Sequence, residues 1–130
     1  MPTPDLSPFA SQMGLEIVEI SSGRVRAKIK IKEAFCDQKN VAASGLAVAV
    51  AEELVTFQMA PYLATNFSMV TNENDATFIA PLRKGEMAYI ECHLVHRDHS
   101  TFNWETLVKR EDGQLVAIVS HTQILKSTEI

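Results

Sequence analysis

Residues 41–57 read Val-Ala-Ala-Ser-Gly-Leu-Ala-Val-Ala-Val-Ala-Glu-Glu-Leu-Val-Thr-Phe and form the most apolar stretch of the chain. The alanine-rich composition predicts a helix that starts at Ser44 and ends just before Pro61. A helix that is apolar on all sides is normally buried. Glu52 and Glu53 interrupt it, and buried carboxylates are costly unless they are paired or hydrogen-bonded. At least one of the two acids is therefore expected to point into a cleft.

Strand periodicity surrounds this helix. In residues 24–32 basic and apolar side chains alternate, which indicates a strand with one wet face. Five other segments have strand character and are bounded by turn signals: 15–20, 67–78, 86–96, 101–109 and 115–126. A short helical turn is expected over 7–13 and ends at Gly14. One helix covers only one face of such an antiparallel sheet, so the sequence predicts an oligomer that uses the open edge or the other face.

The totals describe one domain, residues 1–130, of ordinary globular composition. A net charge of −4 argues against nucleic acid and gives no reason to expect a membrane surface as partner. The basic stripe of residues 24–32 is either a solvated sheet face or a phosphate-binding patch, and the acidic chain favours the first. Two isolated cysteines and a polar N-terminus without a signal peptide predict a cytoplasmic protein. The histidine spacing predicts no metal site, and no cofactor is expected.

Three motifs follow one another at a distinctive spacing. Residues 37–45 read Asp-Gln-Lys-Asn-Val-Ala-Ala-Ser-Gly, and Glu52 lies nine residues after Ala43. Residues 77–86 carry Thr-Phe-Ile-Ala-Pro and then Gly-Glu, and residues 112–117 read Asp-Gly-Gln-Leu-Val-Ala. In order and spacing the chain resembles the hot-dog-fold thioesterases of the phenylacetic-acid-degradation type. Their loop reads roughly Asn-Pro-x-Gly-x-x-His-Gly-Gly, with Asp or Glu nine residues after the His.

The resemblance covers residues 9–126 and implies an α+β hot-dog fold, a curled antiparallel sheet of about six strands wrapped around one long central helix. It keeps the second loop glycine as Gly45 and the acid as Glu52. Its departures from the family's loop include Asp37 for Asn, Asn40 for Gly, Ala43 for His and Ser44 for the first Gly.

By this resemblance the chain hydrolyses an acyl-CoA or similar acyl thioester. Gly45 would offer its backbone N–H to the developing oxyanion, and Glu52 would act as base or nucleophile. The two lie about 10 Å apart along the helix, so the acid is expected to serve a thioester held by a neighbouring subunit. The expected assembly is a homodimer or a dimer of dimers.

Further residues take supporting roles in this hypothesis. Thr56, one turn after Glu52, would orient the carboxylate or the water. Asp37 takes the place of the loop Asn that holds the water. The expected substrate-binding residues are Asn40, Ser44, Arg83 and Lys84. The last two would meet CoA phosphates or else lie in a solvated turn, and Ser44 would also cap the helix.

Alternatives remain for the acids and for the function. Glu52 is alternatively a structural acid that pairs with a buried Arg or Lys or with the preceding loop. Glu53 is expected to face solvent or a subunit contact. The main alternative function is a non-catalytic hot-dog protein that binds an acyl thioester. A dehydratase or hydratase of the same fold ranks last, because such sites pair a His with an acid and no His stands in the loop or the helix.

Overall fold

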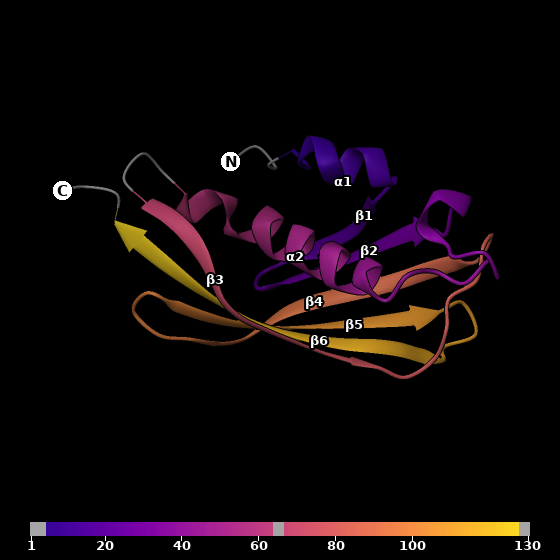
Figure 1. The fold of residues 1–130 in the computed structure, drawn as a ribbon. Helices are drawn as coiled ribbons and strands as arrows, with labels where there is room; N and C mark the ends of the chain where they lie inside the picture. Colours follow the sequence, from indigo (N-terminus) through magenta and orange to yellow (C-terminus); the bar gives the residue numbers. More distant parts are fainter. Residues whose placement is uncertain (1–4, 64–66, 128–130) are drawn as a thin grey trace.

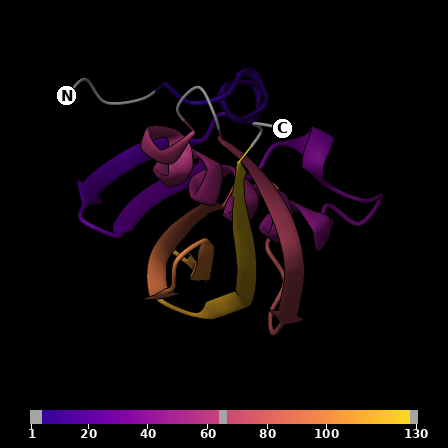
Figure 2. The ribbon, with the colours of Figure 1, turned by 90° about the vertical axis from the view of Figure 1, so that its left-hand side faces the viewer.

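A curled antiparallel sheet wraps around one long helix in the computed structural model, which describes residues 5–63 and 67–127 (Figures 1 and 2). The helices are α1 (Pro8–Met13) and α2 (Gly45–Met59), with 3-10 turns η1 (Glu33–Phe35) and η2 (Ala60–Tyr62). The strands are β1 (Glu16–Ser21), β2 (Arg24–Lys30), β3 (Phe67–Phe78), β4 (Met87–Arg97), β5 (Thr101–Arg110) and β6 (Leu115–Ser127). Their order in the sheet is β1-β2-β4-β5-β6-β3. The predicted hot-dog architecture is confirmed.

The helix α2 lies on the concave face of the sheet (Figure 2). Seven of its side chains are buried: Ala47, Val50, Ala51, Leu54, Val55, Phe57 and Met59. They are spread around the helix because the sheet curls about it on more than one side. The predicted limits are confirmed, since α2 follows Ser44 and gives way to the η2 turn that contains Pro61.

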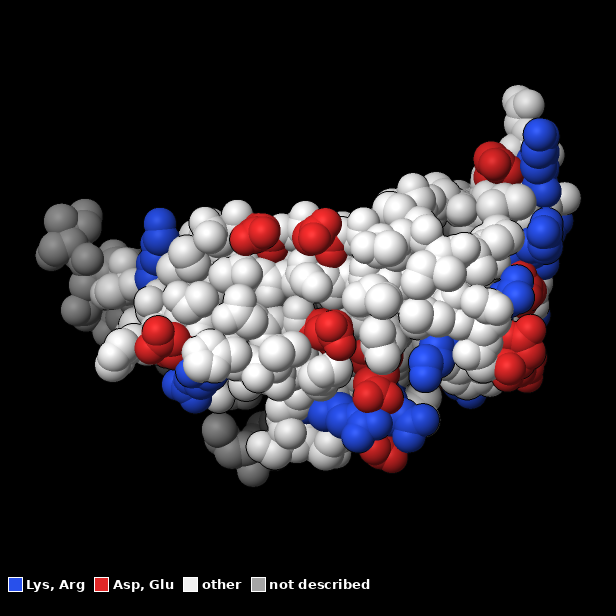
Figure 3. Space-filling view, turned by 90° about the horizontal axis from the view of Figure 1, so that it is seen from below, with Lys and Arg blue, Asp and Glu red and all other residues white. Residues whose placement is uncertain are grey.

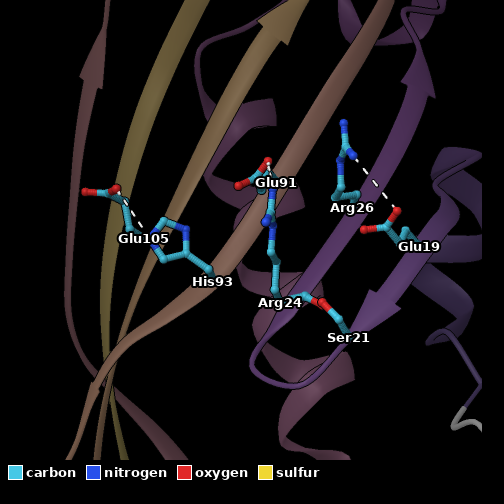
Figure 4. A network of polar contacts seen from close by, with 7 residues as sticks. All are labelled: Glu19, Ser21, Arg24, Arg26, Glu91, His93 and Glu105. Carbon is cyan, nitrogen blue, oxygen red and sulfur yellow. Dashed lines mark hydrogen bonds and ion pairs between the residues drawn. The ribbon is translucent and has the colours of Figure 1, made fainter.

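The alternation in β2 follows the prediction. Val25, Ala27 and Ile29 face the core and are almost fully buried. On the opposite face Arg24 pairs with Glu91 of β4 at 2.9 Å, as Figure 4 shows. Three further basic side chains of this part of the chain have partners: Arg26 with Glu19 at 4.0 Å, Lys28 with Glu16 at 3.7 Å, and Lys32 with the Gln12 carbonyl at 2.9 Å. Acidic and basic side chains mix on the convex face (Figure 3), which supports the solvated face over a phosphate patch.

The short α1 helix also matches its prediction. The Ser7 hydroxyl accepts a hydrogen bond from the Ala10 N–H at 3.0 Å and so caps the first turn. Gly14 ends the helix in the left-handed conformation, with φ of 83°. Among the described residues, no helix is long and apolar enough to span a membrane.

Strand β3 forms an edge of the sheet and is poorly covered. Of its twelve residues only Met69 and Ala76 are half-buried, and the rest are exposed. The exposed residues include Phe67, Val70 and Phe78, whose side chains remain 41–50% exposed. A long uncovered edge strand with apolar side chains is a template for pairing with another chain.

Candidate functional site

The side chain of Asp37 holds the loop that leads into α2 in its conformation. The Asp37 Oδ1 accepts hydrogen bonds from the Lys39 N–H at 2.8 Å and the Val41 N–H at 3.1 Å. Asn40 has φ of 62°, a left-handed conformation that Asn tolerates better than most residues. Its N–H donates to the Asp37 carbonyl at 3.0 Å. One carboxylate oxygen at position 37 is therefore occupied in shaping the loop.

The same loop is tied to the segment before β4. The Lys84 N–H donates to the Asn40 carbonyl at 2.9 Å, and Val41 forms an isolated β-bridge with Arg83. The ammonium of Lys84 lies 3.6 Å from Glu33, while the exposed Arg83 makes no ion pair with any described residue. The predicted residues 37, 40, 83 and 84 thus come together beside the start of α2.

The start of α2 is open to ligands. Ser44 occupies the N-cap position, but its side chain makes no capping hydrogen bond. Gly45 is exposed, and a Cβ added to it would meet nothing within 4 Å. No backbone hydrogen bond among the described residues uses the Gly45 N–H. An N–H at this end of a helix is unpaired within the helix and lies at the positive end of its dipole.

A pocket of about 300 Å³ adjoins this helix end. Ala43, Ser44 and Leu46 line it from the α2 side, and Phe78 and Pro81 line it from the end of β3. Glu52 lies outside it, in keeping with the seven residues, about 10 Å of helix, between Gly45 and the acid. Within one chain the amide and the carboxylate do not meet at one carbonyl group.

Glu52 is half-buried and turns toward β3. Its Oε1 accepts a hydrogen bond from the Thr71 hydroxyl at 3.0 Å. No Lys or Arg of the described chain lies within ion-pair distance, so the structural alternative of a cation pair finds no support there. Thr56 is half-buried on the same helix, and among the described residues it makes no side-chain hydrogen bond to Glu52.

Glu53 makes a contact within the chain that the sequence did not predict. It is half-buried, and one of its oxygens accepts a hydrogen bond from the Ser7 hydroxyl. Because Ser7 caps α1, Glu53 fastens that helix to α2. Within the described chain this side chain therefore has a structural contact and does not project freely into solvent.

His121 of β6 is a residue near the site that the sequence analysis missed. Its side chain is 2% exposed, and neither ring nitrogen has a hydrogen-bond partner among the described residues. Burial lowers the pKa of His121, and the negative charge of Glu52 opposes that shift. The sequence could have indicated this position through the alternation of β6, because Ala117, Val119 and His121 lie two residues apart and share the buried face.

The two cysteines differ in reactivity. Cys92 is fully buried, and burial raises its pKa to about 11, which disfavours the nucleophilic thiolate. Cys36 is half-buried and its thiol donates to the Lys32 carbonyl at 3.3 Å. In the described part of the chain, no three His, Cys, Asp or Glu residues gather in a way that would hold a metal ion.

A larger pocket, of about 450 Å³, lies at the opposite end of α2. No predicted site residue lines it, and neither does any carboxylate. Its cation, Arg97, stacks on the rings of Tyr62 and Phe102 at 5.0 and 4.9 Å. The groups suited to acyl transfer lie instead at the smaller pocket and at Glu52.

Comparisons with known proteins agree with this architecture. Residues 40–117, more than half of the chain, match the family model of the thioesterase superfamily. No curated protein matches the chain. Among solved structures, a thioesterase of Haemophilus influenzae is 17% identical with a TM-score of 0.81, over 94% of this chain and 85% of its own.

Two other solved structures are similar. The PaaI protein of E. coli, from the phenylacetic acid degradation operon, is 12% identical with a TM-score of 0.79, over 91% of this chain and 83% of its own. The protein smu.793 of Streptococcus mutans, solved bound to acetyl CoA, is 16% identical with a TM-score of 0.77, over 89% of this chain and 91% of its own. At these low identities the structural similarity supports the fold alone.

Proposed function

The chain belongs to the thioesterase superfamily, and we propose that it hydrolyses an acyl-CoA with Glu52 as the essential acid. The observation that carries this proposal is the half-buried carboxylate of Glu52, which has no cationic partner in the described chain and faces the uncovered strand β3. The neighbouring Glu53, also half-buried, is occupied by its contact with Ser7 and α1, whereas Glu52 lies on the side of the edge strand that a second copy of the chain can reach.

The oxyanion donor proposed is the Gly45 N–H. Hydrolysis of a thioester builds negative charge on the carbonyl oxygen, and fixed donors aimed at that charge lower the barrier. The helix dipole adds to the effect at this position. Gly45 lacks a Cβ and its surroundings are open, so the carbonyl oxygen can approach the amide closely.

We propose that the working site combines two copies of the chain. About 10 Å of helix separates Gly45 from Glu52, so one thioester uses the amide of one copy and the acid of the other. The exposed edge strand β3 supports this arrangement, because its apolar side chains at Phe67 and Val70 need a cover. A homodimer, or a dimer of such dimers, supplies it.

Other residues of the loop take binding roles in this proposal. Arg83 is exposed beside the pocket and free of a described ion pair, so its guanidinium suits a CoA phosphate better than Lys84, which pairs with Glu33. Ser44 lines the pocket and offers a hydroxyl, and Asn40 shapes the loop. The acetyl CoA bound to the Streptococcus mutans protein supports a CoA ester as the ligand.

A second candidate function is acyl-thioester binding without turnover. Ala43 favours it, since this exposed position carries only a methyl group where the resembled loop has an imidazole. Asp37, the other polar candidate in the loop, already uses one oxygen for loop hydrogen bonds.

The test is release of free CoA thiol from a panel of acyl-CoA esters by the wild type, Glu52→Gln and Glu53→Gln. Glu52→Gln is expected to lose about 100-fold or more of the rate, the usual scale for a general base. Glu53→Gln, the neighbouring acid, keeps an acceptor for Ser7 and is expected to stay active. An inactive wild type that still binds acyl-CoA in calorimetry would favour the binding function, and an active Glu52→Gln would refute the role of Glu52.

A further inference from the structure

Three polar side chains from three elements form a line that ends at Glu52. Gln123 of β6 is fully buried, and its Oε1 lies 3.2 Å from the Thr71 hydroxyl of β3. The same hydroxyl lies 3.0 Å from the Glu52 Oε1. The Nε2 of Gln123 has no hydrogen-bond partner among the described residues. Such a buried donor costs stability unless it is used.

Proton counting decides how this line is connected. The Thr71 hydroxyl has one proton, so it cannot donate to both Gln123 Oε1 and Glu52. If the Gln123 amide is rotated by 180°, its Nε2 donates to the Thr71 oxygen, and the Thr71 proton goes to the carboxylate. Either orientation leaves one amide atom unpaired, but only the rotated one makes both contacts favourable.

The backbone places Thr71 for this role. Thr71 is the Cα partner of Gln123 in the β3–β6 ladder, so both side chains point to the concave face. The register shifts between Thr71 and Glu73, which makes Asn72 the extra residue of a β-bulge. Bulges re-aim side chains and are common next to active sites.

We propose that Thr71 and Gln123 are positioning residues, which orient the Glu52 carboxylate through the path Gln123 Nε2–H to Thr71 Oγ1–H to Glu52 Oε1. This inference rests on the proposed function of Glu52. The path fixes Oε1 and leaves Oε2 of Glu52 to face the water or the thioester. All three residues belong to one chain, so the acid is oriented before a second copy completes the site. The orienting role first considered for Thr56 passes to Thr71.

The test measures kcat and KM for acyl-CoA hydrolysis by Thr71→Val, Thr71→Ser, Gln123→Met and the matched control Thr77→Val. Thr71→Val keeps the shape and removes the donor, so kcat is expected to fall about 10- to 100-fold with little change in KM. Thr71→Ser restores the hydroxyl and is expected to recover most of kcat. Thr77 lies on β3 like Thr71 but pairs with Ile118 of β6, outside the path, and its variant is expected to match the wild type.

The double variant Thr71→Val/Gln123→Met adds a second readout. If the two residues act in series, it is expected to be no slower than Thr71→Val alone. Circular dichroism confirms that each variant is folded. Should Thr71→Val fail to fold, Gln123→Met carries the test, with a smaller but measurable fall in kcat expected.

The outcomes separate this inference from the function itself. Full activity in Glu52→Gln would overturn the proposed function. An inactive Glu52→Gln together with an unchanged kcat in Thr71→Val, or in a folded Gln123→Met, would overturn the path alone. Equal losses in Thr71→Val and Thr71→Ser would also overturn it, since shape and not the donor would then matter.

Discussion

Replacing Asp37 with alanine is expected to loosen the loop that delivers Gly45 to the proposed site. The Asp37 Oδ1 holds two backbone N–H groups, of Lys39 at 2.8 Å and Val41 at 3.1 Å. Alanine leaves both donors to water, and the left-handed turn at Asn40 loses its brace. Asparagine, by contrast, keeps a side-chain oxygen that can accept the same two bonds.

The magnitude follows from those two bonds. A protein hydrogen bond contributes about 0.5–1.5 kcal/mol net, and Asp37 is exposed, so the pair contributes about 1–2 kcal/mol. For a chain of 130 residues, about 4 °C of melting temperature corresponds to each kcal/mol, so Asp37→Ala is expected to melt about 4–8 °C lower. Asp37→Asn is expected to stay within about 2 °C, as surface changes usually do.

Thermal unfolding followed by circular dichroism, together with the CoA-release assay, measures both consequences. Asp37→Ala is expected to lose activity because Gly45 is displaced, whereas Asp37→Asn keeps it. Asp112 accepts a similar bond from the Gln114 N–H at 2.9 Å in a distant hairpin. Asp112→Ala is therefore a control that lowers stability but not activity. If Asp37→Asn lost activity at an unchanged melting temperature, the charge of Asp37 would act in the chemistry and the loop argument would be refuted.

Three further predictions concern the core and the edge strand. At pH 8, Cys36 is expected to react with a thiol reagent in the native protein and Cys92 only after unfolding, because burial raises the pKa of Cys92 to about 11; fast labelling of both thiols would contradict this. Burial lowers the pKa of His121, so the native state binds fewer protons than the unfolded chain, and stability that is complete above about pH 6.5 falls at lower pH. His121→Leu should flatten that fall in melting temperature whereas the exposed control His96→Gln should not, and an unaltered pH slope would speak against the buried imidazole. Val70→Glu places a charge on the exposed edge of β3 and is expected to shift the protein toward monomer in gel filtration without unfolding it; an unchanged elution volume would remove β3 from the subunit contact.

Local signals carried the prediction of the secondary structure. The helix limits depend on alanine-rich composition and on Pro61, and the strand β2 depends on strict alternation over residues 24–30, so both are readable without tertiary information. Local signals could not predict the strand order, because β3 pairs with β6, which lies far along the chain. The bulge at Asn72 was likewise unpredicted, since a single inserted residue changes parity without altering composition.

At the site, the acid was readable from sequence and its partners were not. Glu52 drew attention as a charge in an apolar helix, which is a local conflict. Thr71 and His121 come near Glu52 only in the folded chain, because they lie on β3 and β6, and no sequence spacing relates these strands to the helix. For Asp37 the sequence suggested a role that the structure does not show directly. The resemblance to the family loop indicated a catalytic position, whereas the contacts observed for Asp37 are hydrogen bonds to the backbone of its own loop.

Strands β5 and β6 carry buried polar side chains under α2, where apolar side chains would be expected. Three inward-facing residues of β5 and β6 carry buried side-chain atoms without a described hydrogen-bond partner: Trp104, His121 and Gln123. Leucine or valine at such positions would pack without that cost, as Val108 and Val119 do on the same two strands. Departures from the most stable choice are expected where function requires them, and two of these residues are connected with Glu52: His121 feels its charge, and Gln123 reaches it through Thr71. If the proposed role of Glu52 holds, these two buried polar side chains of β6 are explained by the acid they serve, and the sheet under α2 belongs to the proposed site together with the helix.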